Sequence, residues 1–344
     1  MVCHEMTRTG APLSLCRLVE WLQPRYEIVA ASRRNPAGAL SEGYRKLGIP
    51  IVHEVRAQEF DLILCNTLLA HDVVRDLGHR IPIVWWIHES WIGHSFLPDL
   101  AGTSAAFSAA AEIVFVSEFQ REVVYRPWVH GRSNVSVVEN TSHAPILPVE
   151  RVRKRRLLEP GVFCVLTVAP VSRPKGHDLL LAAAAHLARE PILFYFVGGM
   201  RADMDGIDWA SLKNVRWLGE RSPAEVLAIL READVKCLPS RDESQSLAIL
   251  EAMALGIPVV ASDLPAVQGY LRHGVDALLA PVGDFRVLAG NIEMIRRDPE
   301  LAFALARSAQ NRYRERFSGD RHYRAMEAVL ERAVRRKASA AIAG

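Results

Sequence analysis

Short apolar runs rich in Val and Ile alternate along this chain with longer stretches of helical pattern. In the first half the runs cover residues 61–65, 81–87, 112–116 and 135–138. The rhythm restarts at residues 162–168 and continues through 193–197, 215–218, 235–238 and 258–261. Buried parallel strands have this continuous apolar character, and strands that alternate with helices form doubly wound sheets. The pattern therefore predicts an α/β fold with two doubly wound, Rossmann-like domains.

A Pro-broken and highly charged stretch separates the two series of strands. It contains Pro145 and Pro148 and continues into the basic run 151–156. We predict a first domain over residues 1–150, a second over 151–320, and a charged amphipathic helix with a short tail over 321–344. The basic run is interpreted as a solvated linker, and contact with anionic lipid headgroups or an acidic acceptor is the alternative.

Length, charge and cysteine usage restrict the class of protein. A chain of 344 residues exceeds one ordinary core, and its net charge of +3 is too small to indicate a nucleic-acid partner. The five cysteines are scattered without metal-ligand spacing, which indicates a reducing compartment. With neither a signal peptide nor a membrane-spanning run in the sequence, we expect a cytoplasmic location. Met1, Val2 and Cys3 are too few for an ordinary first strand, which leaves open whether Met1 is the true start.

The segment 238–261 is the most informative, because its pattern predicts a strand, a loop, a helix, a turn and a second strand. Ser244 or Ser246 can cap the helix, and Gly256 ends it. Glu243 then lies in the loop and Glu251 in the second helical turn. The backbone N–H groups of three residues at the helix start, where the helix dipole favours a diphosphate, would be free to bind it. These residues are Gln245, Ser246 and Leu247.

This segment resembles the donor-site signature of the retaining family 4 glycosyltransferases of GT-B type. The resemblance implies two domains facing a central cleft, with the donor held mainly by the second domain and the acceptor by the first. It implies that Glu243 approaches the donor sugar and that Glu251 binds the ribose hydroxyls. The alternative is a loop acid at Glu243 and a solvated helix residue at Glu251.

A second segment, 169–181, directly follows the first strand of the second domain, and its Lys175-Gly176 pair opens a helix. A fixed cation there would stabilise the charge that develops on a departing diphosphate. Lys175 is similar to the phosphate-binding lysine of the family. The family often has Gly-Arg at the end of this strand, and here Ala169-Pro170 stands in that place, so Arg173 is the candidate replacement. A surface Arg and Lys at a helix start are the alternative.

Two segments of the first domain resemble the family as well. The loop containing Gly10 permits close backbone approach to the donor phosphate, although a tight turn without a ligand is also compatible. The strand 81–87 delivers His88 to the carboxyl edge of its sheet, where His88 would hydrogen-bond the donor sugar or stabilise charge at its anomeric carbon. A structural histidine is the alternative.

The resemblance implies a retaining glycosyltransferase that moves a sugar from a nucleoside diphosphate sugar to a glycan, lipid or small-molecule hydroxyl. A nucleotide-sugar epimerase and a catalytically silent nucleotide-sugar-binding protein are the competing hypotheses. Asp203 and Asp205 imitate a metal-binding acidic triplet but belong to a predicted loop, so we expect no essential metal and no cofactor. Peripheral contact with the inner face of a membrane stays open through the basic run.

Overall fold

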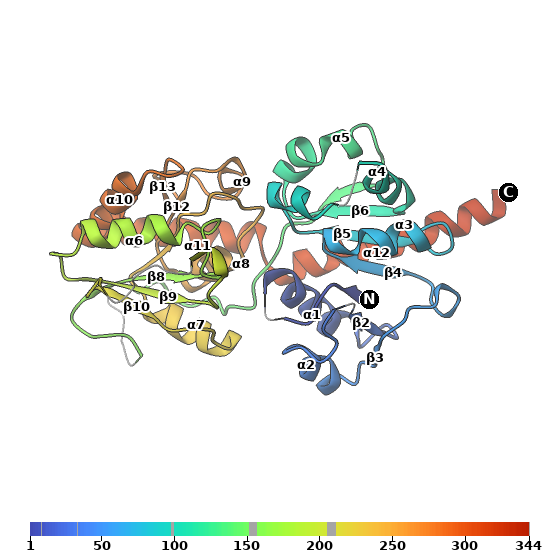
Figure 1. Cartoon of the computed structure of the whole chain (residues 1–344), viewed down its shortest axis with the longest axis horizontal. Helices are drawn as coiled ribbons and strands as arrows, with labels where there is room; N and C mark the ends of the chain where they lie inside the picture. The colour runs from blue at the N-terminus through green and yellow to red at the C-terminus, as the bar shows by residue number, and fades with distance from the viewer. Residues whose placement is uncertain (8, 33, 98–99, 151–156, 205–210, 344) are drawn as a thin grey trace. The chain divides into compact units, whose positions relative to one another are not determined.

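The computed structural model describes residues 1–7, 9–32, 34–97, 100–150, 157–204 and 211–343. The chain divides into two compact units, one formed by Met1–Thr141 together with the segment from Gly319 onward, and the other by Ser142–Ser318. Each unit contains one parallel β-sheet with helices on both faces (Figure 1). The predicted pair of Rossmann-like α/β domains is therefore confirmed.

The sheet of the first unit has the strand order β3-β2-β1-β4-β5-β6-β7. Its strands are β1 (Val2–Cys3), β2 (Ala30–Ser32), β3 (Ile51–Val52), β4 (Ile63–Asn66), β5 (Ile83–Ile87), β6 (Glu112–Phe115) and β7 (Val135–Val137). The α-helices of this unit are α1 (Gly10–Leu22), α2 (Ser41–Lys46), α3 (His71–Leu77), α4 (Leu100–Ala109), α5 (Arg126–Val129) and α12 (Gly319–Ala343). Short 3-10 or π helices cover Ala57–Glu59, Leu68–Ala70, Trp91–Phe96 and Gln120–Val124.

The sheet of the second unit has the order β10-β9-β8-β11-β12-β13. Its strands are β8 (Phe163–Val168), β9 (Ile192–Val197), β10 (Val215–Trp217), β11 (Val235–Leu238), β12 (Val259–Ser262) and β13 (Leu278–Ala280). The helices are α6 (His177–His186), α7 (Pro223–Glu232), α8 (Leu247–Leu255), α9 (Pro265–Gln268), α10 (Phe285–Arg297) and α11 (Pro299–Arg316), with a 3-10 turn at Ala202–Met204.

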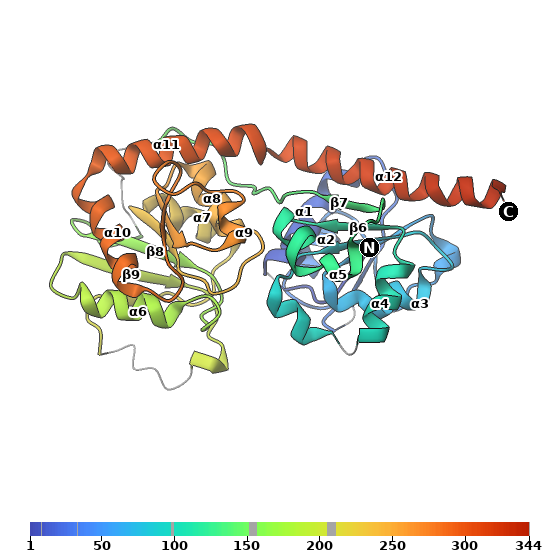
Figure 2. The same ribbon diagram turned by 90° about the horizontal axis from the view of Figure 1, so that it is seen from above.

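Each sheet separates two hydrophobic cores, because successive side chains of a strand point to opposite faces. In the first unit α1, α2 and α12 cover one face, and α3, α4 and α5 cover the other (Figure 2). In the second unit α7, α8 and α11 pack on one face while α6 and α10 pack on the other. The strands are consequently buried on both sides, which explains their continuous apolar runs.

Four strands were not predicted from the hydrophobic pattern. β2 and β3 are short, and β2 consists of Ala30, Ala31 and Ser32, which carry little apolar surface. β13 is a three-residue run that follows a loop. The expectation that Val2 and Cys3 are too short for a strand is wrong, since these two residues pair in parallel with β2 and Val2 also pairs with Cys65 of β4.

The border between the units lies at Thr141 and Ser142, whereas the sequence pattern predicts it near residue 150. Residues 142–149 contact the second unit: the Ser142 hydroxyl lies 3.0 Å from the hydroxyl of Tyr313, and Gln310 Nε2 donates to the carbonyl of Leu147 at 2.6 Å. The prolines and charges indicate an extended, exposed stretch, but its first residues already pack against α11 of the second unit. The basic run 151–156 itself lies outside the described residues.

The C-terminal helix α12 packs on the first unit. Its apolar stripe, which includes Met326 and Val329, joins the core beneath β5 and α1. Glu112 of β6 is fully buried and accepts two hydrogen bonds from Arg332, at 3.1 and 3.0 Å, and Arg336 lies 3.3 Å away. None of the described helices, this longest one included, has the length and apolar character needed to cross a membrane.

His322 and His177 are two of the buried histidines among the described residues, one in each unit. His322 of α12 is 4% exposed, and its Nδ1 donates to the carbonyl of Glu139 at 2.7 Å. His177, the first residue of α6, is fully buried. Desolvation lowers the pKa of each imidazole to about 4. In the unfolded chain the pKa of histidine is about 6.5, so the folded units hold both rings neutral.

Lowering the pH from about 7.5 to about 5.5 is expected to destabilise each unit by about 1.4 kcal/mol per buried histidine. In this window the unfolded chain binds a proton that the folded imidazole, with its lower pKa, does not bind, so stability falls as the pH falls. Urea unfolding at the two pH values measures the loss. In His322→Gln the part of the loss due to this ring should disappear, and an unchanged pH dependence in that variant would contradict the assignment.

Candidate functional site

The candidate site of the second unit lies where its strand order reverses. β8 and β11 are neighbours in the sheet, but the chain visits β9 and β10 between them. The connections that leave two such strands run to opposite faces of the sheet and open a crevice at their carboxyl ends. The loop after β8 ends in Lys175 and Gly176, and the loop after β11 contains Glu243, so both sequence-predicted segments reach this edge.

Lys175 and Glu243 meet directly, although 68 residues separate them in the chain. Lys175 Nζ donates to Glu243 Oε1 at 2.8 Å, and the Ser240 hydroxyl donates to the same oxygen at 2.9 Å. The Glu243 side chain is only 7% exposed, while that of Lys175 is 29% exposed. The carboxylate is thus held from two sides inside the protein, and the ammonium keeps a face open to a ligand.

Gly176 lets the two loops approach each other. Its φ of +74° lies in the left-handed region, and a Cβ at this position would lie 1.9 Å from the carbonyl oxygen of Pro239. Only a residue without a side chain can bring Lys175 this close to the loop after β11.

Gly176→Ala is expected to destabilise the second unit by at least about 2 kcal/mol, because alanine combines left-handed strain with a backbone collision. Gly161→Ala is the matched control, since Gly161 has a φ of +78° but nothing within 4 Å of its ideal Cβ. Urea unfolding of both variants separates strain from collision. Equal losses in the two variants would show that the contact with Pro239 is unimportant.

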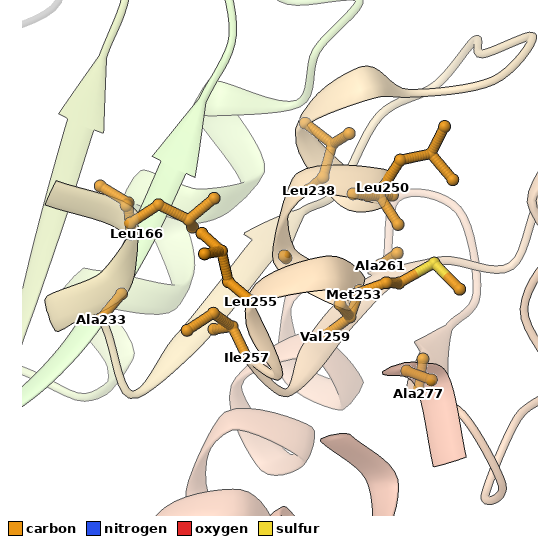
Figure 3. Close-up of a cluster of buried hydrophobic side chains, with 14 of the residues drawn as sticks. Leu166, Ala233, Leu238, Leu250, Met253, Leu255, Ile257, Val259, Ala261 and Ala277 are labelled. Carbon is orange, nitrogen blue, oxygen red and sulfur yellow. The ribbon is translucent and has the colours of Figure 1, made fainter. Parts of the chain in front are cut away.

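The helix after Glu243 begins and ends as the sequence predicts. Ser246 is the N-cap of α8, and its hydroxyl accepts a hydrogen bond from the Ile249 N–H at 3.4 Å. Gly256 ends the helix with a φ of +66°. Figure 3 shows α8 packed on apolar side chains of the sheet, among them Leu238 and Val259. This packing fixes the helix start relative to the strands.

Glu251 lies in the second turn of α8 and is 7% exposed, so it is not a solvated helix residue. Of the three residues whose amides were expected to bind a diphosphate, Ser246 directs its N–H to the Tyr270 hydroxyl at 3.4 Å. Leu247 begins the helix, where amides have no partner within the helix itself. Gln245 is buried, and Ser244 is partly exposed beside it.

Arg173 lies in the same loop as Lys175, but its described contacts lead elsewhere. Its Nε donates to the carbonyl of Asp203 at 3.1 Å, and its backbone N–H donates to the Asp203 carboxylate at 2.7 Å. A second arginine near this edge, Arg241, is also paired within the protein, because its guanidinium donates to Asp178 at 2.7 and 2.8 Å. The role of Arg173 at a phosphate stays a prediction. Asp205, the second acid of the discounted triplet, lies outside the described residues.

In the first unit a buried amide links the two sequence-predicted segments at the corresponding edge. Asn66, at the end of β4, donates from Nδ2 to the carbonyl of Ala11 at 3.0 Å. Its Oδ1 lies 2.9 Å from His88 Nε2 and accepts that proton. Gly10 is the exposed first residue of α1, directly before Ala11. Asn66 therefore holds the helix start and the histidine together.

His88 is only partly exposed, and desolvation by the surrounding protein lowers the pKa of its imidazole to about 3. The nearby His322 lowers this pKa further, by a smaller amount. His88 is therefore neutral at pH 7 and offers a hydrogen-bonding imidazole rather than a positive charge. The next residue, Glu89, accepts the N–H of Leu68 at 2.9 Å, and burial raises the pKa of its carboxyl group.

Sequence reasoning missed three residues near these edges. Asn66 follows an apolar run, Tyr270 lies between α9 and β13, and no local signal distinguishes either residue. Lys236 offered a signal, because a lysine interrupts the otherwise apolar strand β11. Its side chain is fully buried.

Comparison with solved structures identifies the class of fold. The crystal structure of Anabaena HepE in complex with UDP and glucose matches with a TM-score of 0.77 at 20% identity, covering 95% of this chain and 98% of that one. Two parallel, doubly wound sheets in this arrangement along the chain are the fold of GT-B glycosyltransferases.

The sequence comparisons then identify the family. Residues 161–298, which carry Lys175, Glu243 and Glu251, match the family model described as glycosyl transferases group 1. The D-inositol 3-phosphate glycosyltransferase 1 of Catenulispora acidiphila is 31% identical over 338 residues, covering 88% of this chain and 80% of that protein. The chain belongs to the glycosyl transferases group 1 family.

Other curated relatives match over shorter segments. A phosphatidyl-myo-inositol mannosyltransferase of Mycobacterium leprae is 41% identical over 91 residues, which is 26% of this chain and 24% of that protein. Across several such relatives the chain spans between 24% and 60% of their length.

Proposed function

We propose that this chain is a glycosyltransferase that moves a sugar from a nucleoside diphosphate sugar to a hydroxyl group of an acceptor. One observation carries the proposal: the Lys175 ammonium and the buried Glu243 carboxylate are 2.8 Å apart at the reversal of strand order, next to the start of α8. A cation and a helix N-terminus suit a diphosphate, and a fixed carboxylate beside them suits sugar hydroxyls. Family membership and the UDP and glucose bound by Anabaena HepE support the same assignment.

The proposed roles of the residues in the second unit follow from their charges: positive groups bind the diphosphate and carboxylates bind hydroxyl groups. Lys175 and the first amides of α8, beginning at Leu247, would bind the diphosphate and stabilise the charge that develops on it as the glycosidic bond breaks. Glu243 would accept hydrogen bonds from the donor sugar. Glu251 would accept them from the ribose. Arg173 is the candidate for a second phosphate contact, with Ser244 and Gln245 lining the loop.

We propose that the reaction retains the anomeric configuration. The bond between the anomeric carbon and the phosphate oxygen breaks, the acceptor oxygen attacks on the face that the phosphate leaves, and the departing phosphate oxygen takes the acceptor's proton. No side chain then has to act as the base. Product NMR tests this step, and an inverted anomeric centre would overturn it.

His88 and Gly10 of the first unit are proposed substrate ligands. Because Nε2 of the neutral imidazole donates to Asn66 Oδ1, Nδ1 is the acceptor nitrogen of the ring and would accept a hydrogen bond from a sugar hydroxyl, which a charged ring could not do. Gly10 begins α1 without a side chain, so a polar group can approach its backbone.

A thermal-shift panel tests the donor site first. UDP, GDP and ADP sugars are compared on the wild-type chain, on Glu251→Ala and on Glu300→Ala, which removes an exposed glutamate from the first turn of α11. A ligand at about 100 times its dissociation constant adds about 2.7 kcal/mol of stability. We expect one nucleotide class to stabilise the wild type and Glu300→Ala but not Glu251→Ala. No shift with any sugar nucleotide would contradict the proposal.

We further propose that no metal ion is required, since Lys175 and the helix start supply the positive charge at the diphosphate. Release of nucleoside diphosphate should proceed equally in the presence of EDTA. Loss of activity in EDTA that Mg²⁺ or Mn²⁺ restores would overturn this part.

A second candidate function follows from Ala169 and Pro170, which occupy the place where the family often has Gly-Arg. A chain that lacks this arginine could bind a nucleotide sugar without transferring it. Such a silent homologue would pass the thermal-shift test but release no diphosphate with any acceptor. Diphosphate release that Lys175→Ala abolishes would exclude it.

A further inference from the structure

A lysine lies inside the apolar core directly beneath the proposed donor site. Lys236 belongs to the central strand β11, pairs with Leu166 of β8 and Val259 of β12, and has no exposed surface. Its neighbours Val235 and Cys237 point to the face covered by α6 and α10, so Lys236 points to the opposite face, where α8 packs. Figure 3 shows the apolar side chains on this face, Leu238 and Val259 among them.

Burial of an ammonium group in such a core is unfavourable unless opposite charges lie near it. Within the described residues, the hydrogen bond of Lys236 Nζ goes to the carbonyl of Cys237 at 3.2 Å, which is a neutral partner. Three charged residues on neighbouring segments act on the Lys236 ammonium: Glu243 in the loop after β11, Glu251 on α8, and Lys175 before α6. The charge of Lys236 in turn acts on His177 of α6.

Desolvation is the largest influence on the Lys236 ammonium, and nearby negative charge opposes it. Desolvation lowers the pKa of Lys236 to about 8, while the nearby Cys237, Glu243 and Glu251 act in the opposite direction. The ammonium is therefore charged at pH 7 and loses its proton as the pH rises above 8. At neutral pH the proposed donor site thus contains two buried carboxylates and two lysines.

A bound diphosphate would change the balance of charge in the donor site. Of Lys175 and Lys236, only Lys175 is partly exposed, and the diphosphate would attract it away from Glu243. The carboxylates of Glu243 and Glu251 would then face added negative charge with less compensation. We propose that Lys236 is a positioning residue of the donor site, whose buried ammonium holds Glu243 and Glu251 in place while Lys175 binds the diphosphate. This inference rests on the proposed function.

Lys236→Met tests the inference, because methionine fills a similar volume without charge. Lys213→Met is the matched control: it removes the same charge from an exposed residue at the amino end of β10, the opposite edge of the sheet. Calorimetry with UDP, GDP or ADP, whichever belongs to the sugar nucleotide that stabilises the wild type, gives the dissociation constant. We expect binding to weaken roughly thirtyfold in Lys236→Met, as when one member of a buried charge cluster is removed, and to stay at the wild-type value in Lys213→Met.

The pH dependence distinguishes charge from packing. Wild type and Lys213→Met should bind about tenfold more weakly at about pH 9 than at about pH 7, because Lys236 has lost its proton there. Lys236→Met should show no such loss beyond the titration of the nucleotide base, which all three proteins share. The variant should also unfold at a lower temperature than the wild type, because it leaves the buried Glu243 and Glu251 side chains with less compensating charge.

Equal affinities of wild type and Lys236→Met at pH 7 would overturn the inference and leave the proposed function intact. So would an identical fall in affinity at pH 9 in both proteins. The wild-type pH profile provides a test even if the variant does not fold, because affinity that stays constant to pH 9 contradicts a role for the ammonium. A wild type that binds none of the three nucleoside diphosphates would overturn the proposed function itself, and this inference with it.

Discussion

Lys175→Ala is expected to lower kcat/KM by a factor of about 10² to 10³, the loss typical when one preorganised group that stabilises developing charge is removed. Lys175 Nζ is held 2.8 Å from Glu243 Oε1 in a loop that Gly176 fixes against Pro239. It therefore needs no rearrangement of the backbone to reach a diphosphate. The rate of nucleoside diphosphate release, measured with the donor that the thermal-shift panel identifies, gives the effect.

Lys175→Ala should also lose about 1 to 3 kcal/mol of stability, because it leaves the buried Glu243 carboxylate with less compensation. Lys213→Ala is the matched control for the loss of one positive charge. It should leave kcat/KM near the wild-type value, since Lys213 lies at the opposite edge of the sheet. If both variants lose activity equally, the effect comes from net charge and not from the geometry of the site.

The local structure around these residues could be predicted from the sequence because its signals are local. The cap at Ser246, the stop at Gly256 and the Lys175-Gly176 pair each act within a few residues. The meeting of Lys175 with Glu243 follows from one further rule, that loops after neighbouring parallel strands share an edge. The Asn66 to His88 contact needs the register of β4 and β5, in which Asn66 pairs with Trp86, and no local pattern specifies it.

The predicted fold was incomplete for a similar reason. An amphipathic stripe shows that α12 covers a sheet, but not which one, so its docking on the first unit could not be predicted. β2 and β3 have so few apolar positions that their pairing depends on neighbours far along the chain. Lys236 lies within a run that the pattern predicts as a strand, and the hydrophobic pattern does not explain why a lysine is buried there.

The attachment of α12 to the first unit depends on a buried ion pair as well as on apolar contacts. Glu112 is fully buried at the start of β6, and Arg332 binds both of its carboxylate oxygens while also donating to the Ser136 hydroxyl at 2.8 Å. Arg336 reaches the same carboxylate at 3.3 Å. Removing a partner from such a pair leaves a charge with less compensation in a place that water does not reach.

Arg332→Ala is therefore expected to destabilise the first unit by about 3 kcal/mol, measured by urea unfolding. Arg335→Ala is the control, because the pair that Arg335 forms with Glu331 is exposed on both sides. This change should cost less than about 0.5 kcal/mol. In a Glu112→Gln background the same Arg332→Ala change should cost only about 1 kcal/mol, because the carboxylate charge is already gone. A loss that stays at its full size in that background would mean that Arg332 acts through the packing of its side chain and not through its charge.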